Sequence, residues 1–204
     1  MDEKNFEIIT TYLHQTIIAL GRLPVDRVSQ VVRVLRDVRD RGNNIFIFGN
    51  GGSAATASHF ASDLAKGAIC DGKPRLKAFA LTDNVPLLSA WANDTVYDNI
   101  FSEQLENFVE PGDAAIAISG SGNSPNVLNG AKVARARGAI TIGFTGFDGG
   151  KLKGLVDIAI IVPSHSMEQV EDIHLLLEHV ITTCLRQKTL ETLLVAPGLH
   201  AVLR

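Results

Sequence analysis

The 204-residue sequence predicts a doubly wound α/β fold, in which helices cover both faces of a parallel sheet. Two observations predict it. Five short runs are almost continuously apolar instead of alternating, which is typical of strands buried on both faces. Stretches with helical periodicity separate these runs, and this alternation favours parallel pairing. Since no repeat or linker interrupts the pattern, we expect one domain.

The expected elements follow from local patterns. Strands are predicted at residues 45–48, 76–81, 114–118, 140–144 and 158–162. Helices are predicted at residues 5–20, 25–41, 126–137 and 167–185. The first helix precedes the first strand, and its pattern fits packing on a partner subunit as well as covering the sheet. The predicted domain spans residues 1–187, and residues 188–204 form an apolar tail to which no role is assigned.

Composition excludes several classes of function. Nineteen Lys and Arg against 22 Asp and Glu give a formal charge of −3, so the basic excess needed to neutralise nucleic-acid phosphates is missing. The N-terminus begins with acid instead of a basic region, which disfavours a signal peptide. No apolar run approaches the ~20 residues that span a bilayer. Cys70 and Cys184 are too distant in sequence to form a CxxC pair. We expect a cytoplasmic protein that binds neither nucleic acid nor membrane.

Glycine–serine loops follow the first and third predicted strands, at residues 49–53 and 119–124. Ligands of open α/β sheets bind beyond the carboxyl ends of the strands. Glycine lets the backbone approach an anion, and a helix N-terminus offers unpaired N–H groups. One such loop is equally typical of an ordinary turn and helix cap. Two on one sheet favour a phosphate site.

Two familiar phosphate-binding motifs fit these loops less well. Neither loop contains the lysine of a Walker loop, which excludes that class of kinase. Gly49, Gly51 and Ala54 match the dinucleotide fingerprint, but no acidic residue ends the second strand at the expected distance. The match also leaves the second loop unexplained. A dehydrogenase is therefore disfavoured.

A histidine and a carboxylate share one face of the helix that follows the first loop. His59 and Asp63 are four residues apart, and residues at this spacing are neighbours on a helix surface. Placed beside a phosphate site, they become candidates for proton transfer with groups on an opposed helix.

The last long helix carries the candidates for that opposed side. At 100° per residue, Glu168, Glu171 and His179 lie on one arc, whereas His174 lies about 140° from His179. We therefore select the arc, leaving His174 and also Glu178 without a role. A solvated acidic face with half-buried histidines accounts for this helix equally simply.

Several motifs occur in order along the chain: residues 50–54 with 59–61, 93–94 with 98–101, 119–127 and 145–150. From about residue 5 to about residue 186, the chain resembles the sugar isomerase (SIS) family, specifically its phosphoheptose isomerase branch. The resemblance implies one five-stranded, flavodoxin-like sheet and a homotetramer. It also implies isomerisation of sedoheptulose 7-phosphate to D-glycero-D-manno-heptose 7-phosphate through an enediol, in ADP- or GDP-heptose biosynthesis.

The resemblance also implies roles for single residues. Asp63 takes the place of the general base and His179 that of its partner. Some members bind zinc, and the corresponding residues here are His59, Asp63, Glu171 and His179, so Zn²⁺ is the expected cofactor. The resemblance also gives the predicted substrate-binding residues Asn50, Ser53, Asp94, Ser119, Ser121 and Ser124. The glycine–serine loops and the helix arc add Gly51, Gly120, Glu168 and Glu171 to this set.

Two of these positions depart from the family pattern. Asp63 stands where the family has glutamate, and a misplacement of about 1 Å at a catalytic group can cost ~100-fold in rate. Glu171 stands where the family has glutamine, and it could supply the missing reach or an anionic metal ligand. The alternative function is a non-catalytic SIS scaffold, resembling the replication-initiator-associating protein, or a sugar-phosphate sensor. The presence of both His59 and His179 argues for the isomerase.

Overall fold

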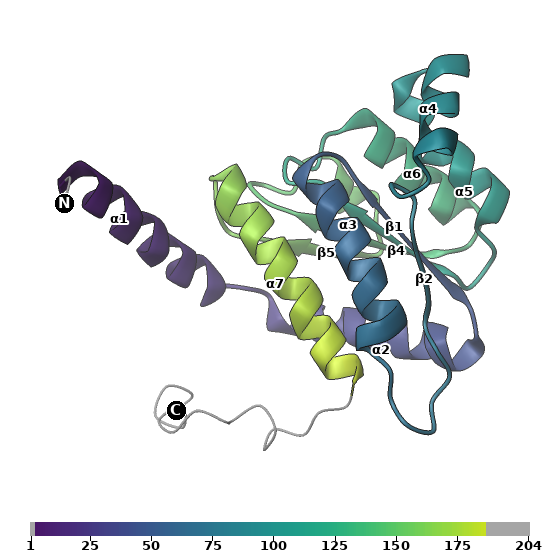
Figure 1. The fold of residues 1–204 in the computed structure, drawn as a ribbon, viewed down its shortest axis with the longest axis horizontal. Helices are drawn as coiled ribbons and strands as arrows, with labels where there is room; N and C mark the ends of the chain where they lie inside the picture. The colour runs from purple at the N-terminus through teal and green to yellow at the C-terminus, as the bar shows by residue number, and fades with distance from the viewer. Residues whose placement is uncertain (1–2, 187–204) are drawn as a thin grey trace.

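The structure is a computed structural model that describes residues 3–186 of the chain. The predicted tail of residues 188–204 lies outside the described residues. Within them, the chain forms one parallel sheet with helices on both faces (Figure 1). The predicted fold class is confirmed.

The sheet contains five strands in the order β2-β1-β3-β4-β5, all paired in parallel. They are β1 Asn44–Gly49, β2 Lys77–Ala80, β3 Ala114–Ile118, β4 Ile140–Thr145 and β5 Ile158–Ile161. This is the flavodoxin-like order, in which the strand sequence reverses between β1 and β3. The loops that follow β1 and β3 therefore flank the crevice where such folds bind ligands.

Seven α-helices lie within residues 3–186. They are α1 Glu3–Leu20, α2 Val25–Arg41, α3 Gly52–Ser62, α4 Val85–Asp94, α5 Ser102–Phe108, α6 Pro125–Ala136 and α7 Met167–Leu185. The four predicted helices are confirmed, α2 and α7 with the predicted bounds, and α3 carries the predicted His59. The sequence prediction lacks α4 and α5. Two short 3₁₀ turns also occur, at Tyr97–Asn99 and Leu152–Gly154.

Alternate side chains of β1 and of β3 enter two separate cores. Ile45 and Ile47 of β1 pack with α2, α3 and α7, whereas Phe46 and Phe48 pack with α5 and α6. The prediction that the strands are buried on both faces holds for β1, β3 and β4 and is wrong for β2. As an edge strand, β2 leaves Phe79 51% exposed.

Helix α3 ends in a wider turn. The segment Asp63–Gly67 is a π-helix, closed by a hydrogen bond from the Ala68 amide to the Asp63 carbonyl. The Gly67 carbonyl accepts a hydrogen bond from the guanidinium of Arg186, just after the end of α7. π-Helical turns are often found at functional sites. Here the turn ties the end of α3 to the end of α7.

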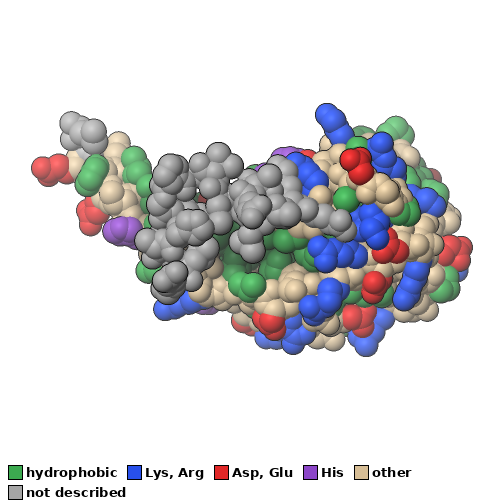
Figure 2. All heavy atoms as spheres, turned by 90° about the horizontal axis from the view of Figure 1, so that it is seen from below, with side chains coloured by type: hydrophobic (Ala, Val, Ile, Leu, Met, Phe, Trp, Pro, Cys, Tyr) green, Lys and Arg blue, Asp and Glu red, His purple; other side chains and the backbone are tan. Residues whose placement is uncertain are grey.

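Helix α1 projects from the body of the molecule (Figure 1). It touches α7 through hydrogen bonds from Tyr12 to the Asp172 carboxylate and from Gln169 to the Tyr12 carbonyl. Its large apolar side chains stay exposed, and Figure 2 shows apolar side chains on this arm. They are Phe6, Ile8, Ile9, Leu13, Ile17 and Ile18. Of the two roles open to this helix, the structure therefore does not support covering the sheet.

The surface shows charges of both signs. On the face seen in Figure 2, Lys and Arg side chains stand among Asp and Glu side chains. Among the residues that the structure describes, none of the helices is long and apolar enough to cross a membrane.

Candidate functional site

The first glycine–serine loop joins the end of β1 to the start of α3. A Cβ atom at Gly49 would lie 2.6 Å from the carbonyl oxygen of Ile118 and 2.7 Å from the Cβ of Ser53, so only glycine fits. Gly51 caps α3 with a φ of 54°, in the left-handed region that favours glycine. Ser53 is buried in the first turn of the helix. The loop therefore brings the N-terminus of α3 close to the end of β3.

A reciprocal amide pair connects the two loops. Asn50 donates to the side-chain oxygen of Asn126 at 2.8 Å, and Asn126 donates back at 2.9 Å. The Tyr97 hydroxyl also donates to Asn50, at 3.1 Å. Asn126, which the sequence prediction does not select although it lies in a quoted motif, thus holds Asn50 in place.

The second loop is braced by a neighbouring loop. The hydroxyl oxygens of Ser119 and Ser124 lie 3.4 Å apart, and the Ser121 hydroxyl accepts a hydrogen bond from the Asn123 amide. A Cβ atom at Gly122 would lie 2.3 Å from the Gly149 carbonyl oxygen, so the two loops are in direct backbone contact. Three of the four predicted phosphate-binding serines, Ser119, Ser121 and Ser124, therefore share one fixed loop beside the end of β1.

The start of α7 lies over this loop. A Cβ atom at Gly120 would meet the sulfur of Met167 at 2.4 Å. Ser166 caps α7 and donates a hydrogen bond to the Glu168 carboxylate at 2.8 Å. The backbone amide of Glu168 and this hydroxyl lower the pKa of the Glu168 carboxyl below its usual value. Glu168 stays exposed at the rim of the loop.

Four ionisable side chains come together between α3 and α7. One possible ligand atom from each of His59, Asp63, Glu178 and His179 can be chosen so that all lie within 4.8 Å of one another. His59 Nε2 lies 4.0 Å from Asp63 Oδ1, and His179 Nε2 lies 3.9 Å from Asp63 Oδ2. The two imidazole side chains are 46% and 50% exposed, so small molecules can reach them. The structure thus brings together three of the four predicted metal-binding residues.

Glu178 is the member of this group that the sequence prediction leaves out. Its side chain is fully buried, and neither carboxylate oxygen has a hydrogen-bond partner. Burial, and then the negative charge of Asp63, raise the pKa of the Glu178 carboxyl to about 8. A signal was available in the sequence, because Glu178 follows Glu171 by seven residues, about two helical turns, and so falls on the selected arc.

Glu171 lies elsewhere on the same helix. A Cβ atom at Gly52 would meet its carboxyl group at 2.6 Å, so this carboxyl rests on the first turn of α3. Eight residues separate Glu171 from His179, which is about 12 Å along a helix axis. Within one chain, Glu171 therefore lies beside the first glycine–serine loop and outside the four-residue group.

Two further polar residues, His174 and Asp94, lie outside the four-residue group. His174 is buried, with Nε2 3.2 Å from the Thr145 carbonyl oxygen, and burial lowers its pKa to about 4. This agrees with the prediction that it points away from His179. Asp94 lies exposed at the end of α4 and accepts a hydrogen bond from Asn93 at 2.8 Å.

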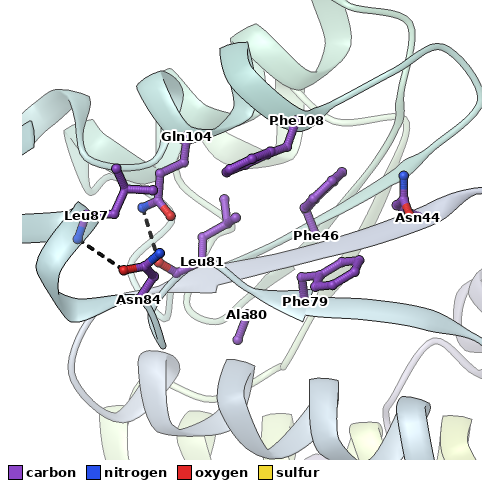
Figure 3. Close-up of a pocket in the computed structure, with 9 residues that line it drawn as sticks. All are labelled: Asn44, Phe46, Phe79, Ala80, Leu81, Asn84, Leu87, Gln104 and Phe108. Atoms are coloured by element: carbon purple, nitrogen blue, oxygen red, sulfur yellow. Dashed lines mark hydrogen bonds between the residues drawn. The ribbon is translucent and has the colours of Figure 1, made fainter.

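A pocket of about 410 Å³ lies beside the edge strand β2 and contains none of the predicted site residues (Figure 3). Rings of Phe46, Phe79 and Phe108 form much of its wall. Two of its polar groups already have partners: Asn84 accepts from the Leu87 amide, and the Gln104 amide donates to a backbone carbonyl. The pocket therefore offers apolar surface and no group suited to acid–base chemistry.

Comparisons with known proteins agree with this arrangement. The SIS domain family model matches residues 12–146. A phosphoheptose isomerase from Aliarcobacter butzleri is 44% identical over 78% of this chain and 82% of its own length. A probable phosphoheptose isomerase from Thermoplasma acidophilum is 38% identical over 87% and 97%. The solved phosphoheptose isomerase of Neisseria gonorrhoeae superposes with a TM-score of 0.81 at 31% identity, covering 88% of this chain and 97% of that one. This chain therefore belongs to the SIS-domain family and, within it, to the phosphoheptose isomerases.

Proposed function

We propose that the chain isomerises sedoheptulose 7-phosphate to D-glycero-D-manno-heptose 7-phosphate for heptose biosynthesis. The observation that carries this is the distance between the two halves of the site. His59 lies seven residues after Gly52, about 10 Å along α3 from the phosphate loops. An extended seven-carbon sugar phosphate has a comparable length from phosphorus to C1. One molecule can thus place its phosphate on the loops and its reacting carbons at the ionisable group.

The serine loops hold the phosphate in this proposal. Hydroxyls of Ser53, Ser119, Ser121 and Ser124 supply neutral donors, and the first turn of α3 supplies backbone N–H groups with a favourable dipole. Asn50, Asp94, Glu168 and Glu171 face the sugar hydroxyls. Glu171 rests on the first turn of α3, between the loops and the ionisable group, which supports that role.

Asp63 and His179 divide the proton transfer. Asp63 removes the proton from the carbon next to the carbonyl and returns it to the neighbouring carbon, while His179 exchanges protons with the carbonyl and hydroxyl oxygens. A carboxylate and an imidazole can share this work when both are held close to the reacting atoms. The 3.9 Å between His179 Nε2 and Asp63 Oδ2 supports their acting on adjacent carbons of one substrate.

The donor set fits a zinc ion. Imidazole and carboxylate both suit Zn²⁺, and the buried Glu178 carboxylate has no hydrogen-bond donor to offset its charge. His59 and His179 would hold the ion together with carboxylates of the group. When bound, zinc supplies a Lewis acid that polarises the substrate carbonyl.

We also propose a cytoplasmic homotetramer that binds the sugar phosphate and neither nucleic acid nor membrane. The exposed apolar face of α1 supports assembly, because a contiguous apolar surface of this kind is typical of an interface. Sedimentation of the wild-type chain at micromolar concentration should give a tetramer. Ile17→Glu, at a side chain 64% exposed in one chain, should give smaller species. A wild-type monomer would contradict the proposal.

The function is tested by incubating the protein with sedoheptulose 7-phosphate in deuterated water and following both sugars by NMR. We expect the aldose to appear with deuterium at C2. Fructose 6-phosphate and unphosphorylated sedoheptulose are the controls, and both should react far more slowly. Binding without conversion or exchange would support the scaffold or sensor. Faster turnover of fructose 6-phosphate would point to a different sugar-phosphate isomerase.

A further inference from the structure

We infer that Glu178, with His59 and His179, forms a three-residue metal site that leaves Asp63 free as the base. The inference rests on the proposed function, since it concerns the same site. It differs from the ligand set that the family resemblance implies, which contains Asp63 and Glu171 and omits Glu178.

The first argument is distance. Ligand atoms bound tetrahedrally to one zinc ion at 2.0–2.2 Å lie about 3.4 Å apart. Glu178 Oε1 lies 3.1 Å from His59 Nδ1 and 3.5 Å from His179 Nε2, so both spacings already match. The corresponding distances from Asp63 to the two histidines are 4.0 and 3.9 Å, longer than the ligand spacing. Glu178 is therefore the carboxylate better placed to share an ion with both imidazoles.

The second argument is burial. Glu178 is 0% exposed, and neither oxygen accepts a hydrogen bond. An isolated buried carboxylate is costly unless it is paired or coordinates a metal. The two histidines lie within ion-pair distance but donate no hydrogen bond to it. A divalent cation between the three side chains meets the need that the protein's own donors leave open.

The third argument concerns the number of ligands. Structural zinc sites use four protein ligands, whereas catalytic sites use three and keep one position open. Two histidines and Glu178 make a three-ligand set of the two-His, one-Glu kind. Asp63 then stays at the edge of the site with its carboxylate available for proton transfer. Glu171, about 12 Å away along α7, is left to contact the substrate.

The test is metal titration of chelator-treated protein with Zn²⁺ and with Co²⁺, without substrate. Losing a supporting residue of a metal site costs 10–100-fold in affinity, so we expect Glu178→Gln to weaken zinc binding by at least about 100-fold. Glu171→Gln and Asp63→Asn are the carboxylate-to-amide controls. Glu171→Gln should stay within about threefold of wild type, and Asp63→Asn, which lies beside both imidazoles without being a ligand, should lose clearly less affinity than Glu178→Gln. The Co²⁺ absorption bands should change in Glu178→Gln and persist in both controls.

Thermal unfolding of the metal-free proteins checks the fold, because Glu178→Gln replaces a buried carboxyl group that has no hydrogen-bond partner with an amide of the same shape and should not lower the melting temperature. If Glu178→Gln does not fold, Glu178→Asp keeps a shorter carboxylate and should still bind zinc more weakly than wild type. Unchanged affinity in the folded Glu178 variant overturns the inference, as does a loss in Glu171→Gln or Asp63→Asn that equals the loss expected for Glu178→Gln. Absence of metal binding by wild type also overturns it. Conversion of sedoheptulose 7-phosphate by the purified wild-type protein decides the proposed function separately.

Discussion

The pocket beside β2 and the ionisable group between α3 and α7 are formed by different kinds of side chain. Phenylalanine rings form much of the pocket wall, and two of the polar side chains that line it, Asn84 and Gln104, are hydrogen-bonded. The ionisable group combines two half-exposed imidazoles with a buried carboxylate that lacks donors. The apolar pocket and the ionisable group thus lie in different places, although His179 also lines a second pocket, of about 460 Å³, together with other residues of α7. In this molecule the convergence of ionisable groups marks the site better than volume does.

The most direct test of whether the ionisable group carries the chemistry is to remove the proposed base. Asp63→Asn keeps the shape of the side chain and removes its basicity, and general acid–base groups contribute 10²–10⁴-fold to rate, so kcat should fall by ~10³-fold. Solvent deuterium incorporation into sedoheptulose 7-phosphate is the measurement. Calorimetric affinity for the sugar phosphate should stay near the wild-type value, because the serine loops are unchanged. Exchange at the wild-type rate would remove Asp63 from the mechanism.

A second prediction separates His174 from the ionisable group on the same helix. Its pKa of about 4 in the fold lies below the ordinary 6.5, so the unfolded chain binds the proton more tightly. Stability is therefore fully present above pH 6.5 and falls as the pH drops towards 4, by ~3 kcal/mol in total. Urea denaturation at pH 7, 5.5 and 4.5 measures this.

The variant His174→Gln is the control for that prediction, because an amide can still donate to the Thr145 carbonyl but does not titrate. Its stability should be lower at pH 7 and should change less over this pH range. Equal pH dependence in the variant and the wild type would show that another group carries the acid sensitivity.

Removing phosphate donors should have a smaller effect. The double variant Ser53→Ala with Ser121→Ala loses two neutral hydrogen bonds worth ~1 kcal/mol each, which weakens binding by about 30-fold. Calorimetry with sedoheptulose 7-phosphate checks this. Ser89→Ala, an exposed serine of α4 outside both loops, is the matched control and should bind normally. A double variant that binds like wild type would move the phosphate site away from the loops.

The smallest effect is expected at the pocket. Phe79→Ser removes a ring whose centroid lies 5.9 Å from that of Phe46, and such contacts are worth ~0.5–1.5 kcal/mol. Thermal unfolding should detect that loss, while kcat/KM should stay within about twofold of wild type. A tenfold loss of kcat/KM in a folded variant would make the pocket part of the function and end the contrast.

Much of this arrangement could be predicted from the sequence. The apolar runs identify all five strands because each run is short and ends at glycine, proline or a polar residue. The helices α4 and α5 are missed for different physical reasons: α4 buries none of its residues fully, and α5 has only seven residues. Neither provides the long apolar stripe on which prediction depends.

The site shows a similar limit. The spacing of His59 and Asp63 predicts their proximity, because the contact is local. Glu171 entered the predicted metal set through the family resemblance, and the angle around α7 does not separate it from Glu178, although the two residues differ by about 10 Å in height along the helix. The amide pair of Asn50 and Asn126 joins residues 76 apart, and no local pattern reports such a contact.

The turn that ends α3 has a mechanical consequence for the site. Arg186 fastens the end of α7 to Gly67, and a Cβ atom at Gly67 would lie 3.3 Å from the Thr182 side chain. The two helices that carry the ionisable group, α3 and α7, are thus fastened together at one end, whereas their other ends contact the glycine–serine loops. A displacement at this contact therefore changes the separation of the two helices at the ionisable group. A bulkier residue at position 67 would push α3 and α7 apart, which would change the affinity of the site for an ion without replacing any residue that touches the ion.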